Sequence, residues 1–271
     1  MGVSKASFAS AEEMAALTGM QVGGVTPFSL PHGMPLYVDD RMIGLDWIIL
    51  GGIWLQRGGA GGPMSEWSKE PLPFTPAGLA KFNANKPGKG PRAVVPAKGN
   101  DPLSDANVPG LLRTLVYARP FQIIPLADKI VQIFEWDRIW REIWIDGRKV
   151  PEDPDPRFYG YSVGRWEGDT LIVDTVGLDP RLWMDEWGTP FSDDLRVEER
   201  WRRLDRDNME LTLTITDPKT FTRPWVTDTK RFRLQPKGSP NGELLEVIFT
   251  PMDEKDFNQK IRDMSNGVTK K

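Results

Sequence analysis

The sequence predicts a mainly β fold, an antiparallel barrel of lipocalin-like size or a sandwich, preceded by an incomplete α/β piece. Three features predict it. Residues 209–216 alternate strictly between apolar and polar side chains, as in a strand with one face in the core and the other in water. Residues 159–175 are typical of a β-hairpin that turns at Glu167-Gly168-Asp169. Eight or so such strands, separated by short turns, are expected in the second half of the chain.

Residues 1–50 predict the order helix, loop, strand, strand. Ser10 precedes a run with two acidic residues in its first turn, which is typical of a helix N-cap, and Gly19 would end the helix. A glycine and proline loop at 23–28, an extended stretch at 35–40 and an apolar strand at 47–50 follow.

Several motifs of this region stand in a characteristic order. They are Ala6-Ser7-Phe8-Ala9-Ser10 with Glu12-Glu13, Leu17-Thr18-Gly19, Gly23-Gly24-Val25-Thr26-Pro27-Phe28 and Val38-Asp39-Asp40. As a set they resemble the second half of the YbaK family of aminoacyl-tRNA deacylases. The resemblance implies that the glycine-to-proline loop forms part of the pocket for the aminoacyl ester, with Gly23 and Pro27 on the GxxxP positions. The site residues that it implies are Gly23, Gly24, Thr26, Pro27, Phe28 and Asp39.

The catalytic lysine of that family lies well upstream of this loop, in a half of the domain that is missing here. Lys5 does not match it, because Lys5 stands in the stretch that leads into the helix. We therefore expect a structural remnant or a gene-fusion relic rather than an active deacylase. A transfer RNA is expected as a partner only if the fragment is active.

Residues 51–120 are unusually rich in glycine and proline, with 11 glycines and 10 prolines in 70 residues. Proline lacks a backbone donor and glycine has no side chain to pack, so regular sheet is not expected. Residues 51–59 suggest the first strand of a new domain. The rest predicts an extended arm over the surface with one short helix, from Thr75 as N-cap and Pro76 in the first turn to about Asn85.

Residues 121–271 form the predicted β domain. Strands are expected at 121–126, 129–136, 138–145, 195–204, 209–216, 227–234 and 244–250, with the hairpin at 159–175 between the third and the fourth. Asp146-Gly147 predicts a further hairpin-type turn, and residues 151–156 a proline-rich loop. A terminal helix is expected at 253–261.

Further motifs run through residues 52–271. They are Ala118-Arg119-Pro120-Phe121, Ile145-Asp146-Gly147-Arg148, Pro151-Glu152-Asp153-Pro154-Asp155-Pro156, Gly160-Tyr161-Ser162-Val163-Gly164-Arg165-Trp166-Glu167-Gly168-Asp169-Thr170 and Asp217-Pro218-Lys219 with Pro224-Trp225. This part resembles a large, functionally uncharacterised family from environmental bacteria, which supplies no catalytic residues. Its members typically begin with an export signal. Here the deacylase-like segment stands in that place, so a cytoplasmic location is expected.

The composition excludes several kinds of site. The chain has no cysteine, and its one histidine is His32, which excludes thiolate chemistry, cysteine-ligated metals, multi-histidine metal sites and a Ser-His-Asp triad in the β domain. The net charge of −3 gives no general case for DNA or an anionic membrane as partner. No apolar run approaches the roughly 18 residues that would span a bilayer. We expect neither a metal nor another cofactor.

Four of the eleven tryptophans fall close together, at Trp136, Trp140, Trp144 and Trp166. On a strand Trp140 and Trp144 share a face, so they either line a cavity for an apolar or sugar-like ligand or fill the barrel interior. Arg141 and Arg165, flanked by aromatic residues, are candidates to bind a carboxylate or stack on a ring. The alternative for both arginines is a structural ion pair with Glu142 or Asp174.

Two further kinds of site have weaker signals. Glu135, Asp137, Glu142 and Asp169 are candidate carboxylates for a glycoside hydrolase, although turn chemistry and surface charge also explain them. Glu152, Asp153 and Asp155 offer oxygen ligands for calcium, but the prolines between them indicate a rigid loop.

The sequence therefore favours a non-catalytic protein that binds a small, partly apolar ligand near Trp140, Trp144, Trp166, Arg141 and Arg165. The alternatives are an aminoacyl-tRNA deacylase and a carboxylate-dependent hydrolase.

Overall fold

The structure is a computed structural model that describes residues 52–57, 63–85, 101–105, 108–248, 250 and 252. The chain divides into two units, Met1–Asp46 and Trp47–Lys271, and every described residue belongs to the second. The fragment predicted over residues 1–50, with its site residues Gly23 to Asp39, lies outside the described residues. The helix predicted at 253–261 does so as well.

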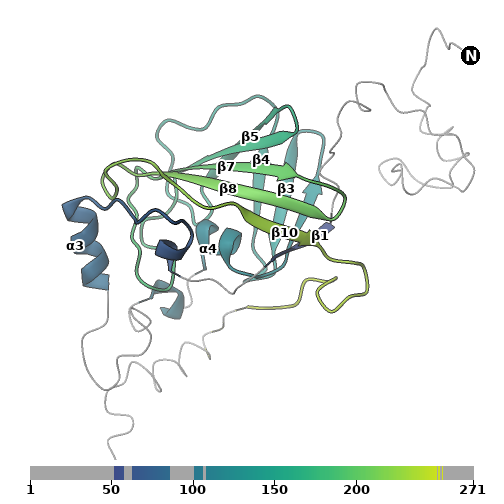
Figure 1. The fold of residues 1–271 in the computed structure, drawn as a ribbon, viewed down its shortest axis with the longest axis horizontal. Helices are drawn as coiled ribbons and strands as arrows, with labels where there is room; N and C mark the ends of the chain where they lie inside the picture. Colours follow the sequence, from purple (N-terminus) through teal and green to yellow (C-terminus); the bar gives the residue numbers. More distant parts are fainter. Residues whose placement is uncertain are drawn as a thin grey trace, which may run out of the picture. The chain divides into compact units, whose positions relative to one another are not determined.

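The described part is a closed β-barrel (Figure 1). Its strands are β1 (Gly52–Gln56), β2 (Phe121–Pro125), β3 (Lys129–Phe134), β4 (Trp140–Trp144), β5 (Tyr161–Glu167), β6 (Thr170–Val176), β7 (Arg196–Arg203), β8 (Asn208–Thr216), β9 (Trp225–Val226) and β10 (Lys230–Leu234). Strand β10 pairs with both β1 and β8, which closes all the strands except β9 into a ring of nine. The prediction of a barrel is confirmed.

A ring with an odd number of strands cannot alternate in direction all the way round, so at least one neighbouring pair must be parallel. That pair is β4 and β5, while every other neighbouring pair is antiparallel. Only two residue pairs, Ile143 with Ser162 and Trp144 with Val163, join the two strands. This contact between β4 and β5 is called the parallel seam below.

The hairpin of β5 and β6 turns at Gly168-Asp169, as predicted. Gly168 has a φ of 62°, which glycine adopts without a steric cost. Inside the barrel, Gly164 leaves room for large neighbours, since a Cβ atom there would lie 3.0 Å from the side chains of Ile143 and Ile145. The predicted turn at 205–208 and the alternating strand after it are confirmed in β7 and β8.

Side chains fill the barrel interior. Met209, Leu211, Leu213 and Ile215 on β8 have no exposed surface, as the alternation predicted. One end of the barrel is covered by helix α4 (Leu111–Val116) and by the loop between β6 and β7, which contribute Leu111, Leu115, Leu182 and Met184 to the core. The buried Arg113 of α4 donates to Asp101 and to the carbonyl oxygens of Trp183 and Asp185, so it ties the helix to this loop.

The described part of residues 51–120 departs from the predicted surface arm. The predicted helix is present as α3 (Pro76–Asn85), and short 3-10 turns η1 (Met64–Glu66) and η3 (Pro102–Asp105) accompany it. However, α4 is a second helix, and β1 belongs to the barrel. Trp54 and Met64 have no exposed surface. Segments of this region therefore belong to the core, to which they contribute Trp54, Met64 and Leu111.

Two other predicted elements are wrong. Asp146-Gly147 does form a turn, with Gly147 at a φ of 85°, but the strands on either side of it are parallel and do not make a hairpin. The described residues of the range 244–250 form no strand and contribute one isolated bridge, from Val247 to Trp136. The ring of strands is closed, so little free edge is left for another strand.

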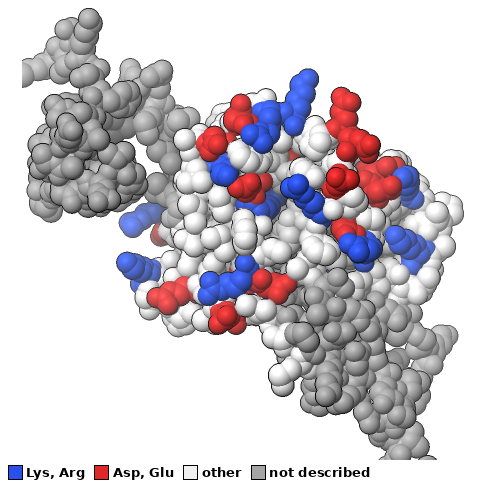
Figure 2. Space-filling model, turned by 180° about the vertical axis from the view of Figure 1, so that it is seen from behind, with Lys and Arg blue, Asp and Glu red and all other residues white. Residues whose placement is uncertain are grey.

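Charge on the surface is mixed. On the face seen in Figure 2, basic and acidic side chains lie next to one another without an extended area of one sign. No helix among the described residues has the length and apolar character to cross a membrane.

Candidate ligand-binding site

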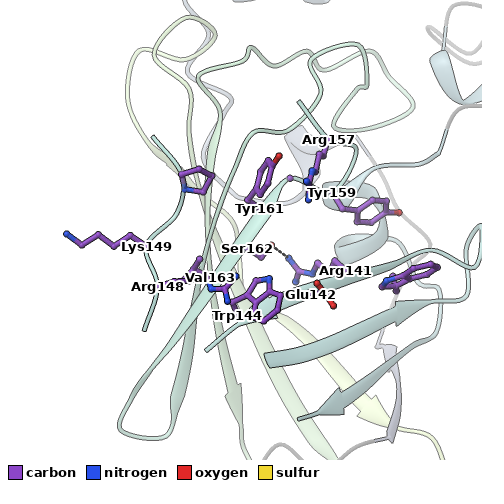
Figure 3. A pocket seen from close by; sticks show the side chains of 13 residues that line it. Arg141, Glu142, Trp144, Arg148, Lys149, Arg157, Tyr159, Tyr161, Ser162 and Val163 are labelled. Atoms are coloured by element: carbon purple, nitrogen blue, oxygen red, sulfur yellow. Dashed lines mark hydrogen bonds between the residues drawn. The ribbon is translucent and has the colours of Figure 1, made fainter. Parts of the chain in front are cut away.

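A cavity with a volume of about 470 Å³ lies at the parallel seam, where β4 and β5 diverge (Figure 3). Its lining residues come from β4, from the connection between β4 and β5, and from the start of β5. They are Trp140, Arg141, Glu142, Trp144, Arg148, Lys149, Pro151, Arg157, Tyr159, Gly160, Tyr161, Ser162 and Val163. In register, residues 140–142 lie opposite 159–161 but do not pair with them. This cavity is called the seam pocket.

The floor of the seam pocket is polar. Arg141 points into the barrel and forms a two-pronged ion pair with Glu199 of β7, with both N–O distances at 2.6 Å. Arg141 Nε donates to the side-chain oxygen of Gln132 at 2.8 Å, and Arg141 Nη1 lies 3.4 Å from Ser162 Oγ. Glu199 has no exposed surface and Arg141 is 4% exposed, so the pair is neutralised inside the barrel.

Hydroxyl groups continue this layer across β5 and β6. Thr175 Oγ1 lies 3.5 Å from the carboxylate of Glu199. Ser162 Oγ and Thr175 Oγ1 share a hydrogen bond of 2.8 Å, in which either hydroxyl group can be the donor. Arg141 already binds the carboxylate of Glu199. The floor therefore combines a compensated ion pair with two hydroxyl groups.

The rim of the pocket combines aromatic rings with cations. The guanidinium carbon of Arg148 lies 3.7 Å from the centre of the Trp144 ring, and that of Arg157 lies 4.0 Å from the centre of the Tyr161 ring. Hydrogen bonds from Arg148 lower the pKa of Asp146, which keeps this pair ionised. The two stacked arginines stand on opposite sides of the parallel seam.

Tyr159 stands at the inner wall. Its ring stacks on Phe134 with 5.5 Å between the ring centres, and its buried hydroxyl has no hydrogen-bond partner among the described residues. Burial raises the pKa of this hydroxyl well above its usual range. It therefore remains a neutral phenol.

Three of the five residues predicted to bind a ligand, Trp140, Arg141 and Trp144, line the seam pocket. The other two do not: Trp166 is 43% exposed near the β5–β6 turn, and Arg165 pairs on the surface with Asp174 and Glu167. The alternative of an ion pair with Asp174 is thus confirmed for Arg165. The partner of Arg141 is Glu199, not Glu142 or Asp174.

The alternative in which the tryptophans fill the barrel interior is wrong for Trp140 and Trp144. Trp140 is 62% exposed, and Trp144 shares its outward face. On β4 the inward side chains are instead Arg141 and Ile143, which are both buried.

The candidate carboxylates for hydrolysis do not form one site. Of the four, only Glu142 lines the pocket, and it is paired with Lys129. Glu135 is buried and accepts from the backbone of Leu245, while Asp169 stands in the β5–β6 turn and accepts from Thr170. The described residues also contain no group of three or more histidine, cysteine or acidic side chains that would hold a metal. Glu152, Asp153 and Asp155 therefore do not form the calcium site that was considered.

Sequence reasoning missed Arg148, Arg157, Tyr161 and Ser162 as pocket residues. One signal was present. The connection from Trp144 to Tyr161 runs from residue 145 to residue 160, and a connection of a dozen or more residues is what parallel neighbours require. A hairpin needs far fewer residues.

Comparisons with known proteins add one finding. Residues 1–53 match the family model of the aminoacyl-tRNA editing domain, to which the YbaK deacylases are related. The predicted resemblance of the N-terminal region is confirmed, although the match covers only this part of the chain. No curated protein and no solved structure matches the chain at a significant level. The resemblance of residues 52–271 to a family from environmental bacteria stays a prediction.

Proposed function

We propose that the β-barrel binds a small, partly apolar molecule in the seam pocket and does not transform it. The observation that carries the proposal is the pocket itself. Its volume of about 470 Å³ falls in the range of roughly 300–1,000 Å³ that is usual for small-molecule sites. Aromatic side chains form its rim and a fixed layer of hydrogen-bonding groups forms its floor, which is the combination that such sites use.

The pocket is built from parts that support one another. The ion pair of Arg141 and Glu199 fixes the floor, and the stacked rings and arginines fix the rim. Binding therefore requires little ordering of side chains, which is a cost that weakens binding at flexible sites. Trp140 is the aromatic residue of the rim with the most exposed surface, so it offers a contact face to the ligand.

A ligand-detected NMR screen of small aromatic, aliphatic and sugar-like compounds tests the proposal. Compounds that bind the parent protein should show no binding signal with a Trp140→Ala variant, or should bind it at least several-fold more weakly. Trp166→Ala is the matched control, because Trp166 is also a partly exposed tryptophan but lies outside the pocket. If no compound distinguishes the two variants, the seam pocket is not the binding site.

A second candidate function, aminoacyl-tRNA editing by hydrolysis of the ester, rests on the family match of residues 1–53. It concerns a part of the chain that lies outside the described residues. Deacylation of mischarged tRNA by the full chain, lost in a Gly23→Val variant of the predicted loop, would support it. Unchanged ester in the presence of the full chain would reject it.

A further inference from the structure

The seam pocket holds more positive than negative charge. Arg141, Arg148, Lys149 and Arg157 line it, against Glu142 alone. A pocket lined by one sign of charge attracts ligands of the other sign. The question is which of these cations are still free to bind a ligand.

Several of the charges are already compensated by neighbours. Glu199 neutralises Arg141, and Asp146 neutralises Arg148. Lys129 neutralises Glu142, so the single acidic group of the lining leaves no net negative charge. Lys149 extends away from the other labelled side chains in Figure 3. The remaining cation of the lining is Arg157.

Arg157 is uncommitted but held in place. Its guanidinium forms no ion pair with any described carboxylate. It stacks on the ring of Tyr161, with 4.0 Å between the guanidinium carbon and the ring centre. Its backbone is fixed, because its N–H donates to Gly177 O at 2.9 Å and its carbonyl oxygen accepts from the backbone of Asp179 at 3.0 Å. A stacked guanidinium keeps its N–H groups free at the edge of the plane.

Arg148 offers a second donor group across the pocket. Its Nε and Nη2 donate to Asp146, whereas its Nη1 has no acceptor among the described residues. Guanidinium groups match the oxygens of carboxylate and phosphate in geometry as well as in charge.

We propose that the ligand of the seam pocket is an organic anion, whose carboxylate or phosphate group is bound by Arg157 with help from Arg148, while its apolar body contacts Trp140. This inference rests on the proposed function and names the class of ligand. It also assigns to Arg157 the role that the sequence suggested for Arg165.

A series of probes with one apolar body and different charges tests the inference. The probes are 2-naphthoate, 2-naphthyl phosphate, neutral naphthalene-2-methanol and cationic 2-naphthylmethylammonium, each titrated into the full chain by calorimetry. We expect at least one of the two anions to bind about tenfold more tightly than the neutral probe, and the cation to bind most weakly. This preference should decrease when salt is raised from about 20 to about 200 mM.

Two variants test whether the preference for anions depends on Arg157. Arg157→Gln should lower the affinity for the preferred anion about tenfold and leave the neutral probe unchanged. Arg165→Gln is the control, since Arg165 is an exposed arginine outside the pocket. If Arg157→Gln fails to fold, the anion affinity of Arg148→Gln and the salt dependence of the parent protein are measured in its place.

The outcomes separate the two proposals. Equal binding of the neutral and anionic probes, insensitive to Arg157→Gln, would overturn the anion inference and leave ligand binding intact. If no probe binds while neutral compounds from the screen depend on Trp140, the anion inference again fails alone. If neither probes nor screened compounds bind, both proposals fail.

Discussion

Glu199 has no exposed surface and Arg141 almost none, so each charge is compensated by the other and not by water. Removing one partner of such a pair leaves a buried charge without compensation, which is far more costly than replacing both partners. The pair also connects β4 to β7 across the interior, so its loss would disturb the floor of the seam pocket.

We predict that Glu199→Gln lowers the free energy of unfolding by about 3–5 kcal/mol. The double variant Arg141→Met, Glu199→Leu should be less destabilised than Glu199→Gln, because no charge is then left buried. Urea unfolding of both variants measures this. As a control, Arg165→Met removes two exposed ion pairs, with Asp174 and Glu167, and should cost less than about 1 kcal/mol. A Glu199→Gln protein as stable as the control would show that the pair is dispensable.

The sequence alone does not predict which face of β4 points into the barrel. Alternation correctly placed Trp140 and Trp144 on one face of the strand. Hydrophobicity favours the face with two tryptophans as the inner one. The structure has the opposite orientation because Arg141 finds a carboxylate, Glu199, on a strand 58 positions further along the chain. No local pattern reveals such a partner.

At the scale of single elements, α3 is joined to the barrel through Thr75, the residue that precedes it. Thr75 Oγ1 accepts a hydrogen bond from Gly78 N at 2.9 Å and donates to Lys219 O at 2.8 Å. The backbone N–H of Thr75 donates to Thr220 O at 2.9 Å. A single side chain therefore caps the helix and joins it to the turn after β8.

We predict that Thr75→Ala lowers the free energy of unfolding by about 1–2 kcal/mol, because the cap and the bond to Lys219 are both lost. Thr75→Ser keeps the hydroxyl and should lie within about 0.5 kcal/mol of the parent. Chemical denaturation of the three proteins provides the comparison. Equal stability of the alanine and serine variants would contradict the capping role.

Elements defined by local signals were predictable, whereas those that depend on distant neighbours were not. Thr75 with Pro76 marks the start of α3, and Gly168 marks the β5–β6 turn, since both depend only on adjacent residues. The parallel seam, the inclusion of β1 in the ring and the absence of a strand at 244–250 follow from the closure of the barrel. Closure is a property of all the strands together.

At the scale of the whole molecule, the number of strands decides where the candidate site lies. Nine strands cannot close without a parallel pair, and this pair is joined at only two positions, so the strands diverge beside it. The seam pocket occupies that gap. The same residues placed on a ring of eight alternating strands would form a continuous wall.

Three aspartates contribute to the response of the fold to acid. Hydrogen bonds from Arg181 lower the pKa of Asp179, those from Lys219 lower the pKa of Asp193, and those from Asn208 lower the pKa of Asp205. A carboxyl group with a lowered pKa in the folded state stabilises the fold above its unfolded pKa of about 3.9. That stabilisation is lost as the pH falls through the folded-state value.

We predict that the melting temperature falls steeply below about pH 4 and that Asp179→Asn makes this fall shallower. Asp179 should contribute more than Asp193, because its side chain is 4% exposed whereas that of Asp193 is 65% exposed and screened by water. Thermal melts from pH 6 to pH 2.5, with Asp193→Asn as the control, measure the difference. If the melting temperature of Asp179→Asn falls with pH as steeply as that of the parent, other carboxylates control the acid stability of the barrel.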